Sequence, residues 1–426
     1  MNTLDIKSAQ PFTTNWWDDF LGETNNLTKT TVFKDCLTRN ETVTMRMNVM
    51  EVIAQLAALR TTQYGYRVYI EGVLVDTAGM EKIYDCPPEK GEEFAHWANR
   101  CFPNQKFGMI INRGEKFCPE LPQGVSKKIA PLLEKAGVPS LGITFTIFIG
   151  NYGWTPLGIH VDGRGENVLH FHLGDGPKEM YTWDKDIYES MTTDADRFNN
   201  KDVEKFLPYA NAFPYDEGDL YFMPQGEYHI GKSDELSMGV TLWFNNHVKE
   251  TLASRTMQLL IDQYLKSSPD FLGLDKNNIS DISSFEEALE LFEIPEEFEN
   301  LTFKDALRLA YKDFRYCIYS HKGFWARPVP IAEDHDFTPS DTVELINPFT
   351  IEYYQTPDNK KLYIYVRGSK FSLNYHSCII DIIDEINKGE KISVAELLLI
   401  MDREWDGNVL FYILNLFYTS HGIKIN

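Results

Sequence analysis

A series of short β-rich segments in the middle of the chain constrains the fold more than any other feature. These segments are separated by Gly, Pro and Asp turns, with no helices expected between them. Short strands that follow one another in this way are typical of an antiparallel sandwich or barrel. We therefore predict an α+β protein built around such a β-structure. The segments cover residues 142–150, 168–173, 179–183, 219–223 and 238–245.

The flanking regions have different patterns, which predict three domains. Residues 1–247 combine mixed helix and strand signals with the β-rich part. Residues 248–337 have apolar residues at helical spacing and are expected to form a helical linker or dimerisation region. Residues 338–426 read as strands followed by three helices, which is the layout of a winged-helix module.

Charge and cysteine usage narrow the class of protein. The 426 residues include 63 acidic and 41 basic side chains, which gives a net charge of −22. Such a chain repels phosphate backbones, so nucleic-acid binding is disfavoured and a basic protein or peptide partner is favoured. The alternative is that the charge only keeps the protein soluble. The six cysteines show no CxxC spacing, and we expect neither a zinc site nor disulfides.

We expect a cytoplasmic protein. The longest apolar runs, such as residues 142–150, are about half a membrane span. The first ten residues lack the basic and apolar segments of a secretory signal. Neither feature favours a membrane protein or a secreted one.

Two histidines and one aspartate are the candidate metal ligands. His160 and Asp162 are two residues apart, so in an extended strand their side chains share a face. The best third ligand is His229, which follows a predicted strand and a Pro-containing turn. Two histidines and one carboxylate leave three octahedral positions open, as in non-haem Fe(II) oxygenases. The alternative is a pair of ordinary histidines with no metal.

The same stretches resemble the JmjC-type cupin oxygenases, which depend on Fe(II) and 2-oxoglutarate. The nearer likeness is to the bacterial ribosomal-oxygenase and asparaginyl-hydroxylase branch, and it covers about residues 60–250. It implies a double-stranded β-helix (jelly roll), iron at His160, Asp162 and His229, and hydroxylation of a protein or peptide side chain. The resembling motifs are IGNYGWTPLGIHVD, GDGPKEMYTW, EGDLYFMPQGEYH and MGVTLWF.

The resemblance also implies residues that bind 2-oxoglutarate. The family needs a cation for the distal carboxylate; Lys178 in GDGPK fits this role, and Arg164 is a rival. A lysine in a surface turn is the alternative interpretation of Lys178. Asn167 and Thr241 occupy positions that resemble polar cosubstrate contacts.

Two further histidines, His170 and His172, lie on one face of the strand after His160. They are either additional metal ligands or ordinary packing residues. Additional ligands would imply a metal site different from that of the family.

Several questions about the substrate stay open. The C-terminal segments GSKFSLN and KISVAELL resemble leader-peptide recognition modules, so a ribosomal protein and a ribosomally made precursor peptide are both candidates. The acidic stretch Glu286–Glu299 is either one wall of a groove for a basic ligand or a solvated helix face. The rival functions are an oxygen-independent metal cupin isomerase or hydrolase, and a non-catalytic acidic peptide-binding protein.

Overall fold

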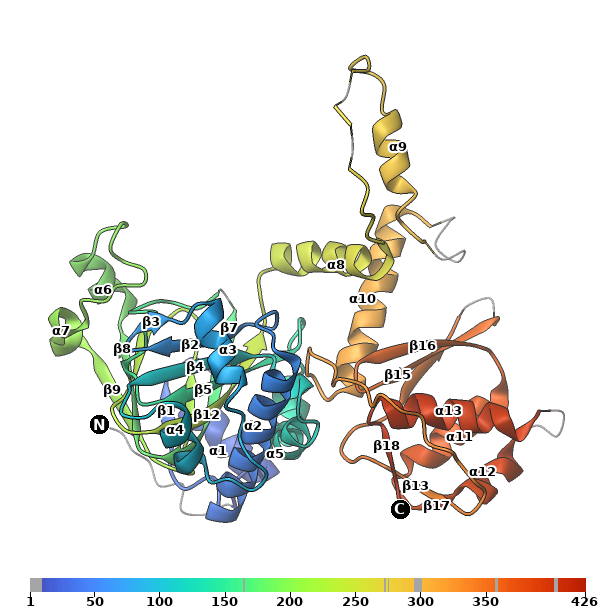
Figure 1. Ribbon diagram of the computed structural model, residues 1–426, viewed down its shortest axis with the longest axis horizontal. Helices are drawn as coiled ribbons and strands as arrows, with labels where there is room; N and C mark the ends of the chain where they lie inside the picture. Colours follow the sequence, from blue (N-terminus) through green and yellow to red (C-terminus); the bar gives the residue numbers. More distant parts are fainter. Residues whose placement is uncertain are drawn as a thin grey trace.

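The structure is a computed structural model, and it describes residues 10–426 except 164, 272, 275, 295–300, 357, 358 and 402–404. Figure 1 shows a large β-rich body formed by the first half of the chain and a smaller body formed by the C-terminal part, from about residue 337. The helices of residues 249–320 stand between and above these two bodies. Among the described residues, no helix combines the length and the apolarity needed to cross a membrane.

The large body is built on eight strands that are divided between two antiparallel sheets. In one sheet the order is β10-β7-β12-β5, and in the other it is β6-β11-β8-β9. Eight antiparallel strands shared in this way between two sheets form a jelly roll, so the predicted antiparallel β-structure is confirmed. The strands are β5 (Ile143–Gly150), β6 (Gly153–Trp154), β7 (Glu166–Asp175), β8 (Lys178–Trp183), β9 (Asn211–Tyr215), β10 (Leu220–Met223), β11 (Tyr228–Ser233) and β12 (Ser237–Asn245).

Residues before the jelly roll widen the first sheet and cover its outer face. β1 pairs with β10 at one edge, and β4, β2 and β3 follow β5 at the other. Leu169 and Phe171 of β7 belong to the buried cluster that also holds Trp17, Val49 and Ile129 of the covering helices. The elements are α1 (Thr14–Glu23), β1 (Thr31–Phe33), α2 (Arg39–Leu59), β2 (Tyr66–Ile70), β3 (Val73–Leu74), α3 (Thr77–Tyr84), α4 (Phe94–Cys101), β4 (Phe107–Asn112), η1 (Gly114–Lys116) and α5 (Glu120–Ala136).

The second sheet is covered by short helices and carries its own small core. Trp183 of β8 and Ile230 of β11 are buried there together with Tyr188 and Phe206. The indole of Trp183 donates to the carbonyl of Phe206 at 2.9 Å. The helices are α6 (Lys185–Met191), α7 (Val203–Phe206) and η2 (Leu207–Tyr209).

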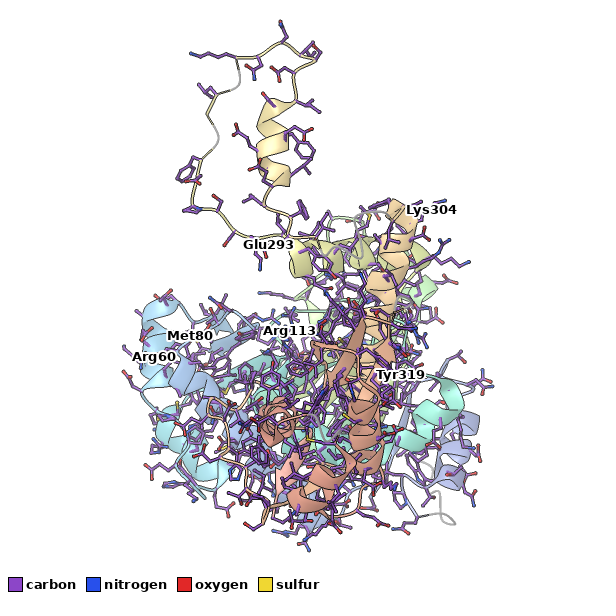
Figure 2. All side chains as sticks on the ribbon, turned by 90° about the vertical axis from the view of Figure 1, so that its right-hand side faces the viewer. Arg60, Met80, Arg113, Glu293, Lys304 and Tyr319 are labelled. Carbon is purple, nitrogen blue, oxygen red and sulfur yellow. The ribbon has the colours of Figure 1, made fainter. Side chains whose placement is uncertain are left out.

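Three helices form an arm that projects from both bodies: α8 (Lys249–Tyr264), α9 (Ser283–Leu289) and α10 (Phe303–Ser320). Figure 2 shows α9 standing apart from the rest of the molecule. Phe271, Leu274 and Ile279 beside it are almost fully exposed. Helix α9 includes only the beginning of the acidic stretch Glu286–Glu299, and residues 295–299 of that stretch lie outside the described residues.

The C-terminal body has a separate hydrophobic core and two three-stranded sheets, with orders β17-β13-β18 and β14-β15-β16. It touches the large body through Arg367, whose guanidinium donates to the carbonyl of Pro119, directly before α5, at 3.0 Å. The winged-helix likeness of this body stays a prediction. Its elements are β13 (Thr342–Leu345), β14 (Glu352–Gln355), β15 (Lys361–Val366), β16 (Ser369–Asn374), α11 (Ser377–Asn387), β17 (Ile392–Ser393), α12 (Val394–Ile400), α13 (Gly407–Thr419) and β18 (Ile423–Ile425).

Candidate metal centre

Backbone pairing brings the two distant histidines together. The amide of His160 donates to the carbonyl of His229 at 3.1 Å, and the amide of His229 donates to the carbonyl of His160 at 2.8 Å. His229 lies on β11, whereas His160 and Asp162 lie on the segment between β6 and β7. The two imidazole rings are therefore neighbours, with ring centroids 4.4 Å apart.

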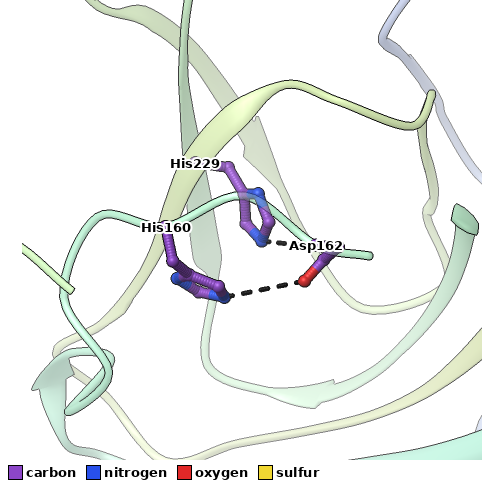
Figure 3. Close-up of side chains that lie close together, drawn as sticks. All are labelled: His160, Asp162 and His229. Atoms are coloured by element: carbon purple, nitrogen blue, oxygen red, sulfur yellow. Dashed lines mark ion pairs between the residues drawn. The ribbon is translucent and has the colours of Figure 1, made fainter. Parts of the chain in front are cut away.

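The three side chains converge on one point, as Figure 3 shows. Nε2 of His160 lies 3.7 Å from Oδ1 of Asp162, and Nε2 of His229 lies 3.5 Å from Oδ2. Of the described residues, these three form a group of potential metal ligands, with ligand atoms within 4.8 Å of one another. The predicted triad thus forms one cluster.

The hydrogen bonds of the histidines leave the correct nitrogens free for a metal. Nδ1 of His160 contacts the carbonyl of Gly158 at 2.8 Å, and Nδ1 of His229 contacts that of Glu227 at 3.0 Å. A carbonyl only accepts, so each Nδ1 carries the proton and each Nε2 presents a lone pair. Such backbone partners orient metal-binding histidines.

Burial sets the charge of the triad. It lowers the pKa of His160 and of His229 to about 4 each, and the neighbouring His229 contributes to the shift of His160. It raises the pKa of Asp162 to about 6. At neutral pH both imidazoles are neutral and Asp162 is ionised. Because Oδ2 of Asp162 is buried without a hydrogen-bond partner, a bound cation fits this donor set.

The triad opens into a cavity of about 210 Å³ between the two sheets. A polar row crosses its floor on five neighbouring strands: Asn112, Thr146, Thr241, His170 and Tyr221 occupy matching register positions. The hydroxyl of Thr146 donates to Oδ1 of Asn112 at 3.1 Å, and Nδ1 of His170 lies 2.8 Å from the hydroxyl of Thr241. All five line the cavity.

Lys178, the predicted cosubstrate cation, lies inside the same cavity. Its side chain is buried, and Nζ stands 5.1 Å from the centre of the Phe148 ring. The Lys178 ammonium forms no ion pair with any carboxylate in the described part of the chain. A Cβ added to Gly231 would lie 3.4 Å from Cε of Lys178. Since Gly231 is two residues from His229 on β11, the lysine stem runs alongside the strand that carries this candidate ligand.

The other predicted cosubstrate residues have different outcomes. Thr241 lines the cavity, as expected. Asn167 does not, which corrects its predicted position: Val168 and His170 of β7 face inward, so residue 167 points to the opposite face of the strand. There its Oδ1 accepts from the amide of Gln225 at 2.9 Å. Arg164 lies outside the described residues.

The additional histidines do not join the triad. His170 lines the cavity beyond the triad, and its Nε2 is buried without a partner. A side chain at Gly239 would exclude this ring, because an added Cβ would lie 2.4 Å from Nε2 of His170. His172 does not line the cavity, and its Nε2 donates to the carbonyl of Gly176 at 2.9 Å. Both histidines are thus separate from the group of potential metal ligands.

Among the described cavity residues that sequence reasoning did not find, three carry a polar atom that is buried without a hydrogen-bond partner: Arg67, Tyr215 and Tyr221. The two tyrosine rings stack with centroids 5.4 Å apart, and both hydroxyls are buried without a hydrogen-bond partner. Tyr215 and Tyr221 alternate with charged and apolar neighbours like residues of any strand. No local signal distinguishes them, since only the closure of the jelly roll brings them near Lys178.

Fold and site together define a jelly-roll protein with a cluster of two histidines and one carboxylate that could hold a metal ion. No family profile matches the sequence, and no curated protein matches it. Among solved structures, one similar chain is ycfD of E. coli, with 14% identity, a TM-score of 0.47, and coverage of 96% of this chain and 98% of that one.

Two further solved structures are similar. YcfD, a ribosomal oxygenase from Escherichia coli, in complex with cobalt and 2-oxoglutarate, has 13% identity, a TM-score of 0.45 and the same coverage. The non-heme alpha-ketoglutarate-dependent carbocyclase SnoK from nogalamycin biosynthesis has 16% identity, a TM-score of 0.35, and coverage of 63% of this chain and 98% of that one. At these identities and scores, a function for this chain has to rest on its own site.

Proposed function

We propose that the protein is an Fe(II)- and 2-oxoglutarate-dependent dioxygenase that hydroxylates a side chain of a protein or ribosomally made peptide. One observation carries the proposal: two neutral histidines and an ionised carboxylate converge in a cavity that also holds the buried, unpaired ammonium of Lys178. A three-ligand set leaves positions for a bidentate cosubstrate and dioxygen. A buried cation is costly unless an anion meets it.

Each group of cavity residues has a distinct task in this proposal. His160, Asp162 and His229 would hold Fe(II), and Lys178 would pair with the distal carboxylate of 2-oxoglutarate. The hydroxyls of Tyr215 and Tyr221 offer further donors. When bound, iron and cosubstrate supply the oxygen chemistry: 2-oxoglutarate and dioxygen become succinate and carbon dioxide, and one oxygen atom enters a substrate C–H bond.

The remaining walls would keep water away from that chemistry. Ile110, Phe148, Leu157, Met180 and Met223 are apolar lining residues. No protein base is needed, since the hydrogen is taken from carbon and both triad histidines would be occupied by the metal. The protein therefore contributes position and exclusion of solvent.

Substrate recognition is proposed to involve the open edge of β16. In the sheet order β14-β15-β16, β16 has one neighbour. The backbone amide of Tyr375 donates to the carbonyl of Lys360. Because hydrogen-bonded pairs alternate along an antiparallel ladder, Leu373 and Phe371 are the next residues of β16 whose backbone bonds to β15. The backbone of Ser372 then faces the free edge, where an extended peptide could add as a strand.

The charge and the arm support two further parts of the proposal. A net charge of −22 favours a basic partner over nucleic acid, and we propose that this partner is met in the cytoplasm. The exposed apolar side chains of α8, Met257 and Ile261, support a homodimer through the arm.

The function is tested by metal binding and by turnover. Wild-type protein should bind about one Fe(II), or Mn(II) as a surrogate, and release succinate with 2-oxoglutarate, oxygen and a peptide substrate. His160→Ala, Asp162→Ala and His229→Ala should each lose the metal signal in electron paramagnetic resonance while keeping a native circular dichroism spectrum. The exposed His96 gives the matched control, His96→Ala.

The outcomes separate the rival functions. Metal retained in all three triad variants would remove the metal centre. Metal-dependent turnover of a substrate without oxygen or 2-oxoglutarate would indicate a cupin isomerase or hydrolase. Peptide binding that is unaffected by metal removal and is accompanied by no turnover would indicate a non-catalytic binding protein.

A further inference from the structure

A second cation borders the cavity from outside the eight jelly-roll strands. Arg67 lies on β2, in register with Ile110 of β4 and, through it, with Phe148 of β5. All three residues line the cavity that contains the triad. Nε of Arg67 is buried without a hydrogen-bond partner. Within the described ranges, no carboxylate lies within ion-pair distance of the Arg67 guanidinium, which distinguishes it from Arg60 nearby, paired with Glu81 and Asp85.

The charges of the cavity leave Arg67 uncompensated. Asp162 is the one carboxylate among its described lining residues, and Lys178 and Arg67 are the cations. With the proposed metal and cosubstrate in place, the two positive charges of Fe(II) and that of Lys178 are balanced by Asp162 and the two carboxylates of 2-oxoglutarate. The charge that remains is the guanidinium of Arg67.

We infer that Arg67 selects a substrate whose reacting end carries a carboxylate. This inference rests on the proposed function and names the substrate class of the same site. A carboxylate opposite Arg67 brings the loaded cavity to neutrality, and the planar guanidinium can bind it through two parallel hydrogen bonds. A lysine or arginine side chain in that position adds a second unbalanced positive charge in a weakly polar environment, where charge repulsion is strongest.

This local requirement differs from the charge of the whole molecule. A net charge of −22 repels free anions at long range, although salt screens that repulsion beyond about 8 Å under physiological conditions. Close to Arg67, the attraction of the guanidinium therefore outweighs the repulsion by the net charge. A carboxylate delivered by a larger, basic partner meets both conditions, because the partner binds through its basic part and inserts an acidic residue.

The test measures how near three small probes come to the metal. Protein loaded with Mn(II) and saturated with 2-oxoglutarate is mixed with the N-acetyl N-methylamides of aspartate, asparagine and lysine. Mn(II) broadens the proton NMR lines of any probe that enters the cavity, and no turnover is needed. We expect the aspartate derivative to be broadened most and the lysine derivative least.

Variants assign the effect to Arg67. Arg67→Gln should reduce the broadening of the aspartate derivative roughly tenfold, the weight of a charge-assisted hydrogen bond, and Arg67→Lys should restore part of it. The matched control is Arg60→Gln, because Arg60 borders the outer groove beside Arg67 but not the cavity. This control should leave the broadening unchanged.

The failures are distinguishable. If the lines of 2-oxoglutarate itself are not broadened by Mn(II), the proposed function is wrong and the inference falls with it. If 2-oxoglutarate is broadened but the lysine derivative is broadened as strongly as the aspartate derivative, or Arg67→Gln has no effect, the inference alone is overturned.

Discussion

At the scale of single residues, the environment of Lys178 indicates that the cavity binds an anionic cosubstrate. Its ammonium is buried beside Phe148, and its stem crosses above Gly231. No carboxylate compensates it within the described part of the protein. A positive charge in such a place needs an anionic ligand to offset its loss of hydration. Because Lys178 lies apart from the three potential ligands, a change of this residue should affect cosubstrate binding and leave metal binding intact.

We predict that Lys178→Met weakens 2-oxoglutarate binding about tenfold to a hundredfold, the range for a hydrogen bond to a charged group. Methionine keeps the length and burial of the side chain but removes the charge. Calorimetric titration of the Mn(II)-loaded protein measures the affinity, and Mn(II) binding itself should not change. Lys232→Met on β11 is the control, because Lys232 is half-exposed and pairs with Asp234. Unchanged affinity in Lys178→Met would direct attention to Arg164.

At the scale of elements, each sheet needs a glycine where a large side chain of the adjacent strand lies across it. Gly231 on β11 faces Met180 and Lys178 across neighbouring positions, and Gly239 on β12 makes room for the ring of His170. The alternation of side chains along β7 decides which of its residues line the cavity, because it turns Val168 and His170 inward and Asn167 outward.

We predict that Gly231→Ala reduces affinity for 2-oxoglutarate severalfold while metal binding is retained. The added Cβ would lie 3.0 Å from Sδ of Met180 and 3.1 Å from the hydroxyl of Thr155, so these two side chains, which lie beside the Lys178 stem, have to shift. Titration of the Mn(II)-loaded variant measures both properties. Gly124→Ala is the control, because nothing lies within 4 Å of its added Cβ. Wild-type affinity would show that the space above Gly231 is not used.

The edge of β16 gives a second prediction at this scale. Ser372→Pro should abolish strand addition without unfolding the domain, because proline removes an N–H that faces the free edge, and edge strands tolerate it there. Binding of a full-length peptide substrate should weaken at least tenfold, whereas turnover of a short peptide around the reacting residue should stay unchanged. Ser372→Ala, which keeps the N–H, should behave as wild type. If both variants bind the full-length peptide normally, recognition occurs elsewhere.

The whole molecule combines two separately cored bodies with an arm of which α10 packs against both bodies. Helix α10 links them: the hydroxyl of its Tyr311 donates to the carbonyl of Ser140 in the large body at 3.3 Å, and its Asp313 accepts hydrogen bonds from Tyr354 and Tyr365 of the C-terminal body. In contrast, α8 and the residues around α9 expose many apolar side chains. Exposed apolar surface of this extent is typical of interaction sites.

We predict a homodimer that dissociates when α8 is made polar. The double variant Met257→Glu/Ile261→Glu places two like charges on the proposed contact, so its molar mass at micromolar concentration should fall to half that of the wild type in analytical ultracentrifugation. Val73→Glu, at an exposed apolar position of β3, is the control and should remain dimeric. A wild-type protein that is monomeric under these conditions would contradict the prediction.

The sequence by itself determined those features that depend on neighbours along the chain. Short β-rich runs between Gly, Pro and Asp turns identified β5, β7, β8, β10 and β12, and the spacing of His160 and Asp162 placed two candidate ligands on one face. The third ligand, His229, was found because a strand and a turn precede it.

Only the tertiary structure decided which residues share the cavity. Asn167 and His172 lie outside it, whereas Arg67, Tyr215 and Tyr221 lie within it. The physical reason is that the sequence of a strand shows which residues share a face, but does not show which of the two faces points into the cavity. That choice depends on the pairing register between segments far apart in sequence, and on the packing of helices α1, α2 and α5 against the outer face of the sheet.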